Sequence, residues 1–247
     1  MTEAHYDCGH PVEIEDEPRH HLVISNEYVR ALAVEIAPHE RTLCHRHPHD
    51  YLLYVASGSE IISAARDEEP KRLSYRDGEC ELSSAGLIHV VENLGEASFR
   101  NAVVELLPRV GELRRGAPPN RITKGLDAVE VFDRTTVIGL LDEDRAAIFV
   151  VAVEPGAEVE IPGPAIVATP YGNRLNPDAL GDVEVRNDSV FDVAWVPPHE
   201  TAILWGCWER AERAVVFQVG RTGEQGLAVP VAREPLQSLL AHADEPE

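Results

Sequence analysis

Three histidines and a tyrosine alternate at every second position in the stretch TLCHRHPHDYLLYVASG, as His45, His47, His49 and Tyr51. On a β-strand, residues two apart point to the same face, so His45 and His47 would share one face. Their backbones would lie roughly 6 to 7 Å apart, which lets the two imidazole rings converge on one ion. The spacing therefore favours a metal site over an incidental run of histidines.

The elements that would position these residues are predicted to be short β-strands. Residues 42–47 are expected to form one strand, Pro48-His49-Asp50 a tight turn, and residues 51–57 the returning strand. Elsewhere, short runs rich in Val, Ile and Leu alternate with Gly, Pro, Asn and Asp, which is typical of an all-β sandwich or barrel. Residues 235–242 are the best helix candidate, because proline suits the first turn of a helix.

Three short matches in the same order indicate an internal duplication. The matched segments are VEIAPHE (34–40) with VAVEPGAE (151–158), SSAGLIHVVEN (83–93) with VPPHETAILWG (196–206), and NAVVE (101–105) with RAVVF (213–217). The segment 107–125 is rich in Pro, Gly and Arg and is predicted to connect two units. A chain of 247 residues has room for two such units.

With these residues in view, the chain resembles the cupin family. The first cupin motif, G-x5-H-x-H-x3,4-E-x6-G, is matched in spacing by His39, His45, His47, Tyr51 and Gly58. The second, G-x5-P-x-G-x2-H-x3-N, is matched by Gly78, Ser84, Gly86, His89 and Asn93. The resemblance implies an all-β chain of two tandem jelly-roll barrels, with metal ligands at His45, His47 and His89.

The resemblance and the repeat divide the chain into five segments. They are an N-terminal arm (1–19), a cupin domain with the metal site (20–108), a linker (109–125), a degenerate cupin domain (126–222) and a C-terminal tail with a short helix (223–247). The second domain is called degenerate because other residues stand where the first has His45, His47, Tyr51 and His89, namely Pro162, Pro164, Ala168 and Ala202. These side chains bind no metal, so this domain is expected to act in structure, packing or dimer contacts.

Tyr51 is the main departure from the motifs, because it replaces the glutamate that is the usual carboxylate ligand. Tyr51, His49 or Asp50 could take the place of that ligand. Tyr51 is also the candidate catalytic residue, since its hydroxyl can hydrogen-bond a substrate or take part in proton transfer. His49 and Asp50 are otherwise expected to lie in the turn.

The implied three-histidine site suggests the kind of function. Neutral ligands leave a divalent ion at its full charge, which favours a small anionic or chelating ligand such as a carboxylate, enolate or thiolate. Imidazole suits Fe²⁺, Zn²⁺, Mn²⁺, Ni²⁺ and Cu²⁺, and the resemblance to three-histidine cupin dioxygenases favours Fe²⁺. We therefore expect a metal-dependent small-molecule enzyme, with an Fe(II) dioxygenase as the first candidate. A metal-assisted isomerase, epimerase or lyase and a non-enzymatic small-ligand-binding cupin are the alternatives.

Composition argues against several classes of partner. Acidic residues number 43 against 22 basic ones, and the net charge of −21 repels nucleic acid and anionic lipid. With no apolar stretch of membrane-spanning length and no secretion signal, a cytoplasmic protein is expected. A homodimer is compatible with the second domain's packing role.

Three further expectations concern side chains outside the motifs. The four cysteines have no regular spacing and are expected to be free thiols, with Cys44 only packing. Glu105, in the last strand of the first unit, is expected to face solvent. His5, His10, His20 and His21 lie in a polar N-terminal stretch and are assigned no role.

Overall fold

The computed structural model describes residues 6, 8–112, 128–132, 135–142, 146–155, 157–169, 185–187, 192–198, 200–205, 212–220 and 231–233. The elements of the first unit are β1 (Val12–Glu13), η1 (a 3₁₀ turn, Ile14–Asp16), β2 (His20–Ser25), β3 (Val29–Ile36), β4 (His45–Arg46), β5 (Tyr51–Ser57), β6 (Glu60–Ala65), β7 (Lys71–Ser74), β8 (Cys80–Ser83), β9 (Ile88–Asn93), β10 (Phe99–Leu106) and α1 (Pro108–Glu112). Those of the second unit are β11 (Ala128–Phe132), β12 (Thr135–Asp142), β13 (Ala146–Val153), β14 (Glu158–Pro162), β15 (Ala165–Ala168), β16 (Val185–Asn187), β17 (Asp192–Val196), β18 (Thr201–Trp205), β19 (Glu212–Val219) and β20 (Val231–Arg233).

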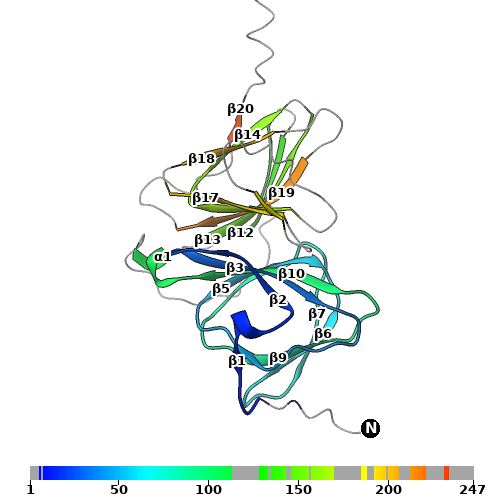
Figure 1. Cartoon of the computed structure of the whole chain (residues 1–247). Helices are drawn as coiled ribbons and strands as arrows, with labels where there is room; N and C mark the ends of the chain where they lie inside the picture. The colour runs from blue at the N-terminus through cyan, green and yellow to red at the C-terminus, as the bar shows by residue number, and fades with distance from the viewer. Residues whose placement is uncertain are drawn as a thin grey trace, which may run out of the picture.

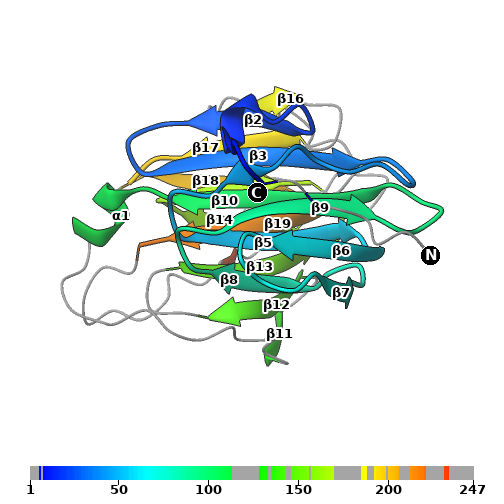
Figure 2. The same ribbon diagram turned by 90° about the horizontal axis from the view of Figure 1, so that it is seen from below.

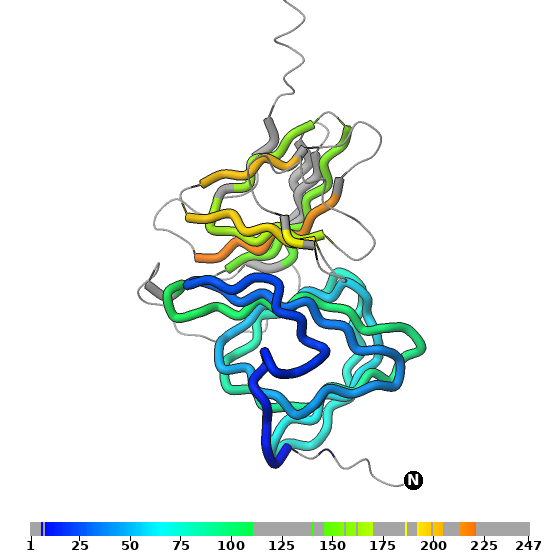
Figure 3. The backbone as a smooth tube through the Cα atoms, in the orientation of Figure 1, coloured from blue at the N-terminus to red at the C-terminus, as the bar shows by residue number. Residues whose placement is uncertain are grey.

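The first unit is a barrel made of two five-stranded sheets, in the orders β1-β4-β9-β6-β7 and β2-β3-β10-β5-β8. Figure 3 shows the chain of this unit winding around a common interior. The N-terminal segment passes from one sheet to the other, because β1 pairs with β4 and β2 pairs with β3. Between them, η1 places the fully buried Ile14 in the core of the barrel.

The second unit repeats this arrangement, as the internal sequence matches predict. Its larger sheet has the order β11-β12-β13-β19-β15-β17-β16, and its smaller sheet β18-β14-β20. The run β12-β13-β19-β15-β17 therefore corresponds strand for strand to β2-β3-β10-β5-β8 of the first unit. The duplication visible in short sequence matches is a duplication of sheet topology.

The two barrels pack against each other through the β2-β3-β10-β5-β8 sheet of the first unit and the seven-stranded sheet of the second, which lie as the two middle layers in Figure 1. One apolar core fills the first barrel, a second fills the other, and a third joins residues from both units. Tyr54 of β5 meets Phe217 of β19 edge-on at a ring-centroid distance of 6.3 Å. The stacked strands are seen from below in Figure 2.

The observed elements match the sequence expectations in part. The strand at residues 51–57 is confirmed as β5, whereas the strand expected at 42–47 is regular only over β4. The expected helix at 235–242 lies outside the described residues. Within the described part of the chain, no helix is long and apolar enough to span a membrane.

The expectation of free thiols was wrong for two of the four cysteines. Cys8 and Cys44 form a disulfide, with Cα atoms 5.2 Å apart. The N-terminal segment lies alongside this position, because the Val12 N–H donates to the Cys44 carbonyl at 2.9 Å. Cys80 is a free, buried thiol, and Cys207 lies outside the described residues.

Glu105 also differs from expectation, because its side chain is fully buried rather than solvent-facing. β10 is the central strand of its sheet, with β3 on one side and β5 on the other, so both of its edges are covered. Arg30 on β3 is the register partner of Glu105, and its Nη2 lies 2.6 Å from Glu105 Oε2. A paired arginine therefore allows a carboxylate to occupy this interior position.

Candidate metal centre

The three histidines of the cupin motifs meet inside the first barrel. His45 on β4 and His89 on β9 are register partners, with ring centroids 4.6 Å apart. The ladder continues beyond β4, because the His47 N–H donates to the Leu87 carbonyl at 2.9 Å. His45 and His47 are buried while Arg46 between them is exposed, as strand alternation requires. The three motif rings are therefore neighbours, with centroids 4.6 to 5.2 Å apart.

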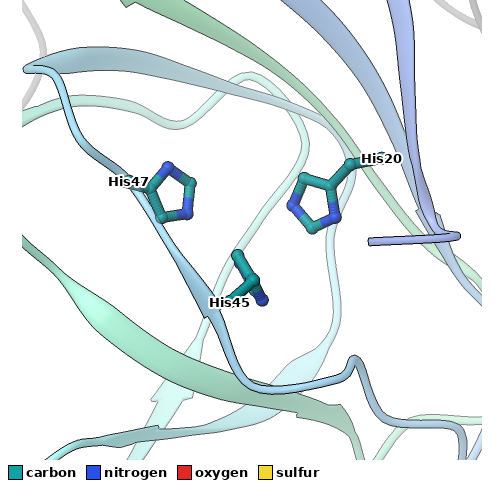
Figure 4. A group of neighbouring side chains, drawn as sticks. All are labelled: His20, His45 and His47. Carbon is teal, nitrogen blue, oxygen red and sulfur yellow. The ribbon is translucent and has the colours of Figure 1, made fainter. Parts of the chain in front are cut away.

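A fourth imidazole, that of His20, was missed by the sequence reasoning. It comes from β2 in the opposite sheet, and its ring centroid lies 4.6 Å from that of His45. The side chains of His20, His45 and His47 each offer a nitrogen, and these atoms all lie within 4.8 Å of one another. Figure 4 shows the three rings grouped around a common space. In the structure His20 is buried and its neighbour His21 is exposed, a difference that the sequence does not reveal.

Hydrogen bonds fix the orientation of these rings. His20 Nδ1 lies 2.7 Å from the Glu17 carboxylate, and His89 Nδ1 lies 3.1 Å from Ser63 Oγ. His45 Nδ1 lies 3.0 Å from the Leu43 carbonyl, which can only accept, so this nitrogen is the protonated one. In these three rings Nδ1 is occupied and Nε2 remains available as a ligand. In the fourth ring, His47 Nδ1 is buried without a hydrogen-bond partner among the described residues.

The free nitrogens fit a divalent ion. His45 Nε2 is buried and has no hydrogen-bond partner within the described residues. The Nε2 atoms of His47 and His89 lie 3.3 Å apart. Two nitrogens bound to one tetrahedral ion at about 2.0–2.1 Å each would be about 3.4 Å apart. The donor set, buried imidazole without carboxylate, suits the transition metals expected from the sequence.

Burial keeps the imidazoles of His45, His47 and His89 neutral. Burial, and then the charge of His20, lower the pKa of His45 to about 4. Burial and the neighbouring imidazoles hold the pKa values of His47 and His89 well below the ordinary value. Neutral imidazole is the form that binds metal, so the cluster is ready for an ion at neutral pH.

Glu17, behind His20, is an ionised buried carboxylate. Burial alone would raise its pKa, but the hydrogen bond and charge of His20 and two backbone N–H groups lower it to about 2. Those N–H groups belong to Arg19 and Leu43, at 2.8 and 3.1 Å from the carboxylate oxygens. Glu17 was not identified from the sequence either, because it lies in the stretch assigned to the N-terminal arm.

Tyr51, the candidate catalytic residue, lies beside the cluster. Its ring stacks on His47 with centroids 4.2 Å apart, and its side chain lines the same cavity. Burial raises the pKa of Tyr51, so its hydroxyl stays protonated at neutral pH. It can therefore donate a hydrogen bond but is a poor anionic ligand.

His49 and Asp50 lie apart from the cluster. His49 is only half-buried and lines a separate surface pocket together with Asp50. The Asp50 carboxylate accepts a hydrogen bond from the Ala85 N–H at 2.7 Å, so it holds the loop before β9. Among the described residues it is the ring of His20 that comes closest to taking the place of the missing carboxylate.

A cavity of about 130 Å³ adjoins the four histidines. Most of its wall is apolar, with polar side chains at a few points. Such a cavity is what a small-molecule site requires. In the second unit, Pro164, Ala168 and Ala202 are buried at the positions matched to the ligands. Within the described residues, the group of histidines that could hold a metal ion lies in the first unit.

Comparisons with known proteins address the fold. No protein-family model and no curated protein sequence matches the chain. AerE from Microcystis aeruginosa is similar in structure, at 12% identity and a TM-score of 0.55, over 83% of this chain and 99% of that one. The Bacillus subtilis oxalate decarboxylase, studied for its Mn(II) centres, is 13% identical at a TM-score of 0.52, over 90% and 77%.

A glyoxylate-induced protein from Pseudomonas aeruginosa is 16% identical at a TM-score of 0.52, over 83% of this chain and 79% of that one. At such low identity the likeness concerns the fold, not the activity. Each of these matches spans most of both chains, and so includes both barrels. Together with the sheet topology, they show that this chain has the all-β fold of two tandem cupin barrels.

Proposed function

We propose that the first barrel binds a divalent transition-metal ion and acts as a metal-dependent enzyme on a small anionic or chelating molecule, as an Fe(II) dioxygenase. The observation that carries this proposal is the convergence of four buried imidazoles on one cavity, with His45 Nε2 left without a partner among the described residues. His45, His47 and His89 would hold the ion, with His20 as a further ligand.

The ion would supply a Lewis-acidic, redox-active centre with positions open to other ligands. The residues of the chain orient the imidazole rings, offer a hydrogen-bond donor and exclude water. Glu17, Leu43 and Ser63 orient three of the rings through their Nδ1 atoms. Tyr51 offers a protonated hydroxyl beside His47, and the apolar wall excludes water from the reacting molecule.

A metal-assisted isomerase, epimerase or lyase is the second candidate. The observation that favours it is the carboxylate of Glu81, which lines the same cavity as the histidines and can accept a proton. The similar oxalate decarboxylase is a lyase by name and was studied for its Mn(II) centres, which is compatible with this candidate. A non-enzymatic ligand-binding protein would use the same cavity without turnover.

Metal content and oxygen uptake separate these functions. Protein purified without chelators is analysed for metals, and His47→Ala is compared with His49→Ala, a histidine two residues away outside the cluster. We expect His47→Ala to lose the metal and His49→Ala to keep it. Bound iron with oxygen uptake on a β-diketone, thiol or phenolic acid supports the dioxygenase. Zinc- or manganese-dependent turnover without oxygen uptake supports the second candidate, and absence of metal binding overturns both.

A further inference from the structure

The cavity holds a second polar group, centred on Glu81 of β8. Tyr75 Oη donates to Glu81 Oε1 at 3.2 Å, and Ser83 Oγ lies 3.3 Å from the same oxygen. No described residue forms a hydrogen bond with the other oxygen, Oε2. All three side chains line the cavity that adjoins the histidines. Two hydroxyls thus hold the carboxylate by one oxygen and leave the other for a ligand.

Glu81 lies within reach of a ligand bound at the histidines. Tyr51 stacks on His47 and is the register partner of Ser83, with whose hydroxyl it interacts. Ser83 in turn contacts Glu81, so two side chains separate the carboxylate from the metal-binding cluster. A cavity of about 130 Å³ is close in size to the engineered cavity of roughly 150 Å³ that accommodates benzene. One small molecule would therefore touch both ends.

Asn101 adds a third polar point to the wall. It is buried on β10 between Val34 of β3 and Val55 of β5, and its side chain lines the cavity. No hydrogen bond to its amide is found among the described residues. A buried amide of this kind usually has a partner, so a ligand is a suitable one.

Charge then decides what kind of ligand fits. If the proposed function is correct, the metal end of the cavity is cationic and attracts an anionic or chelating group. The opposite end carries the Glu81 carboxylate, which accepts hydrogen bonds and repels a second anion. We infer that Glu81 is the specificity-determining residue, selecting a small monoanion with a hydroxyl or amine donor at its far end. Dianions of the same length are disfavoured.

Three four-carbon acids that differ only at the far end test this inference. Butyrate, 4-hydroxybutyrate and succinate present a methyl, a hydroxyl and a carboxylate, and their binding to the metal-loaded protein is measured by calorimetry. Because a hydrogen bond to a charged group is strong, we expect 4-hydroxybutyrate to bind about tenfold more tightly than butyrate, and succinate to bind most weakly. Glu81→Gln should weaken the preference for the hydroxyl, because a neutral amide oxygen accepts a weaker hydrogen bond than a carboxylate, and should strengthen succinate binding about tenfold.

Glu79→Gln is the matched control, because Glu79 is a neighbouring acid outside the cavity wall and its loss changes the net charge equally. Metal content and the melting temperature of each variant show that fold and metal site are intact. If Glu81→Gln keeps its metal and retains the wild-type order of ligands, this inference is overturned while the proposed function stands. Failure of all three acids to bind the metal-loaded protein also overturns it. A wild-type protein that binds no metal overturns the proposed function instead.

Discussion

The carboxylate of Glu17 lies 2.7 Å from Nδ1 of His20, in the core of the first barrel, where both side chains are almost fully buried. A carboxylate behind a histidine is a common arrangement around metal ligands, because it fixes the ring and raises the basicity of the other nitrogen. Here it joins a residue near the N-terminus to the histidines of the cupin motifs. The centre is therefore larger than the motifs indicate.

Replacing His20 by Ala is expected to weaken metal binding at least tenfold, because it removes one imidazole from the cluster. Glu17→Gln should cost roughly 10- to 100-fold in metal affinity, since residues that orient ligands have effects of that size. His21→Ala is the control, as this neighbour on the same strand is exposed. Competition with a chelating dye measures the affinities. If His20→Ala and His21→Ala bound the metal with equal affinity, His20 would not be a ligand of the ion.

The buried histidines predict that the metal-free protein loses stability in acid. The pKa of His45 is lowered to about 4, from an ordinary value of 6.5. Between these values the unfolded chain binds a proton that the folded chain does not, so the stabilising contribution is complete above pH 6.5 and disappears as pH falls towards 4. For this residue the difference is about 3 kcal/mol. Urea unfolding of chelator-treated protein between pH 4.5 and 8 measures it.

His45→Gln should flatten that pH dependence, because the substituted side chain does not titrate. The exposed His21 provides the comparison, and His21→Gln should leave the slope as it is. A slope unchanged by His45→Gln would show that His45 is not buried as a neutral imidazole.

The buried ion pair of Arg30 and Glu105 predicts an asymmetry between single and double substitutions. Burial raises the pKa of Glu105, while Arg30 opposes that rise. Arg30→Met would leave a buried carboxylate without its partner and should lower the free energy of unfolding by about 3–5 kcal/mol. The double variant Arg30→Met with Glu105→Leu should recover most of that loss. Chemical denaturation of the three proteins tests this, and additive effects would contradict it.

The Cys8–Cys44 disulfide closes a loop with a sequence separation of 36 residues. A crosslink of that length is expected to stabilise the fold by about 3–4 kcal/mol through the entropy of the unfolded chain. Cys8→Ser should therefore lower the free energy of unfolding by that amount, whereas reductant should not affect Cys8→Ser further. Mass spectrometry of the unreduced protein detects the bond directly. Two alkylatable thiols at Cys8 and Cys44 in the native protein would refute it.

The sequence was sufficient to predict the all-β barrels and the proximity of the three motif histidines, because strand alternation and fixed spacing are local properties. His45 and His47 share a face for that reason, and His89 lies opposite His45 across one ladder. His20 could not be found in this way, since its approach to His45 depends on how β2 lies across the barrel. The Cys8–Cys44 bond and the burial of Glu105 likewise depend on contacts between distant segments.

Because the two barrels share an apolar core, the second unit covers one face of the first. The sheet that carries Tyr51 and Asn101 on its inner face presents Tyr54 to Phe217 on its outer face. In a chain cut after the first unit, that apolar outer face would be exposed to solvent. Exposed apolar patches of this kind promote aggregation. We therefore expect the first unit to need the second as a cover for this face, so that deleting one copy would cost the protein its solubility.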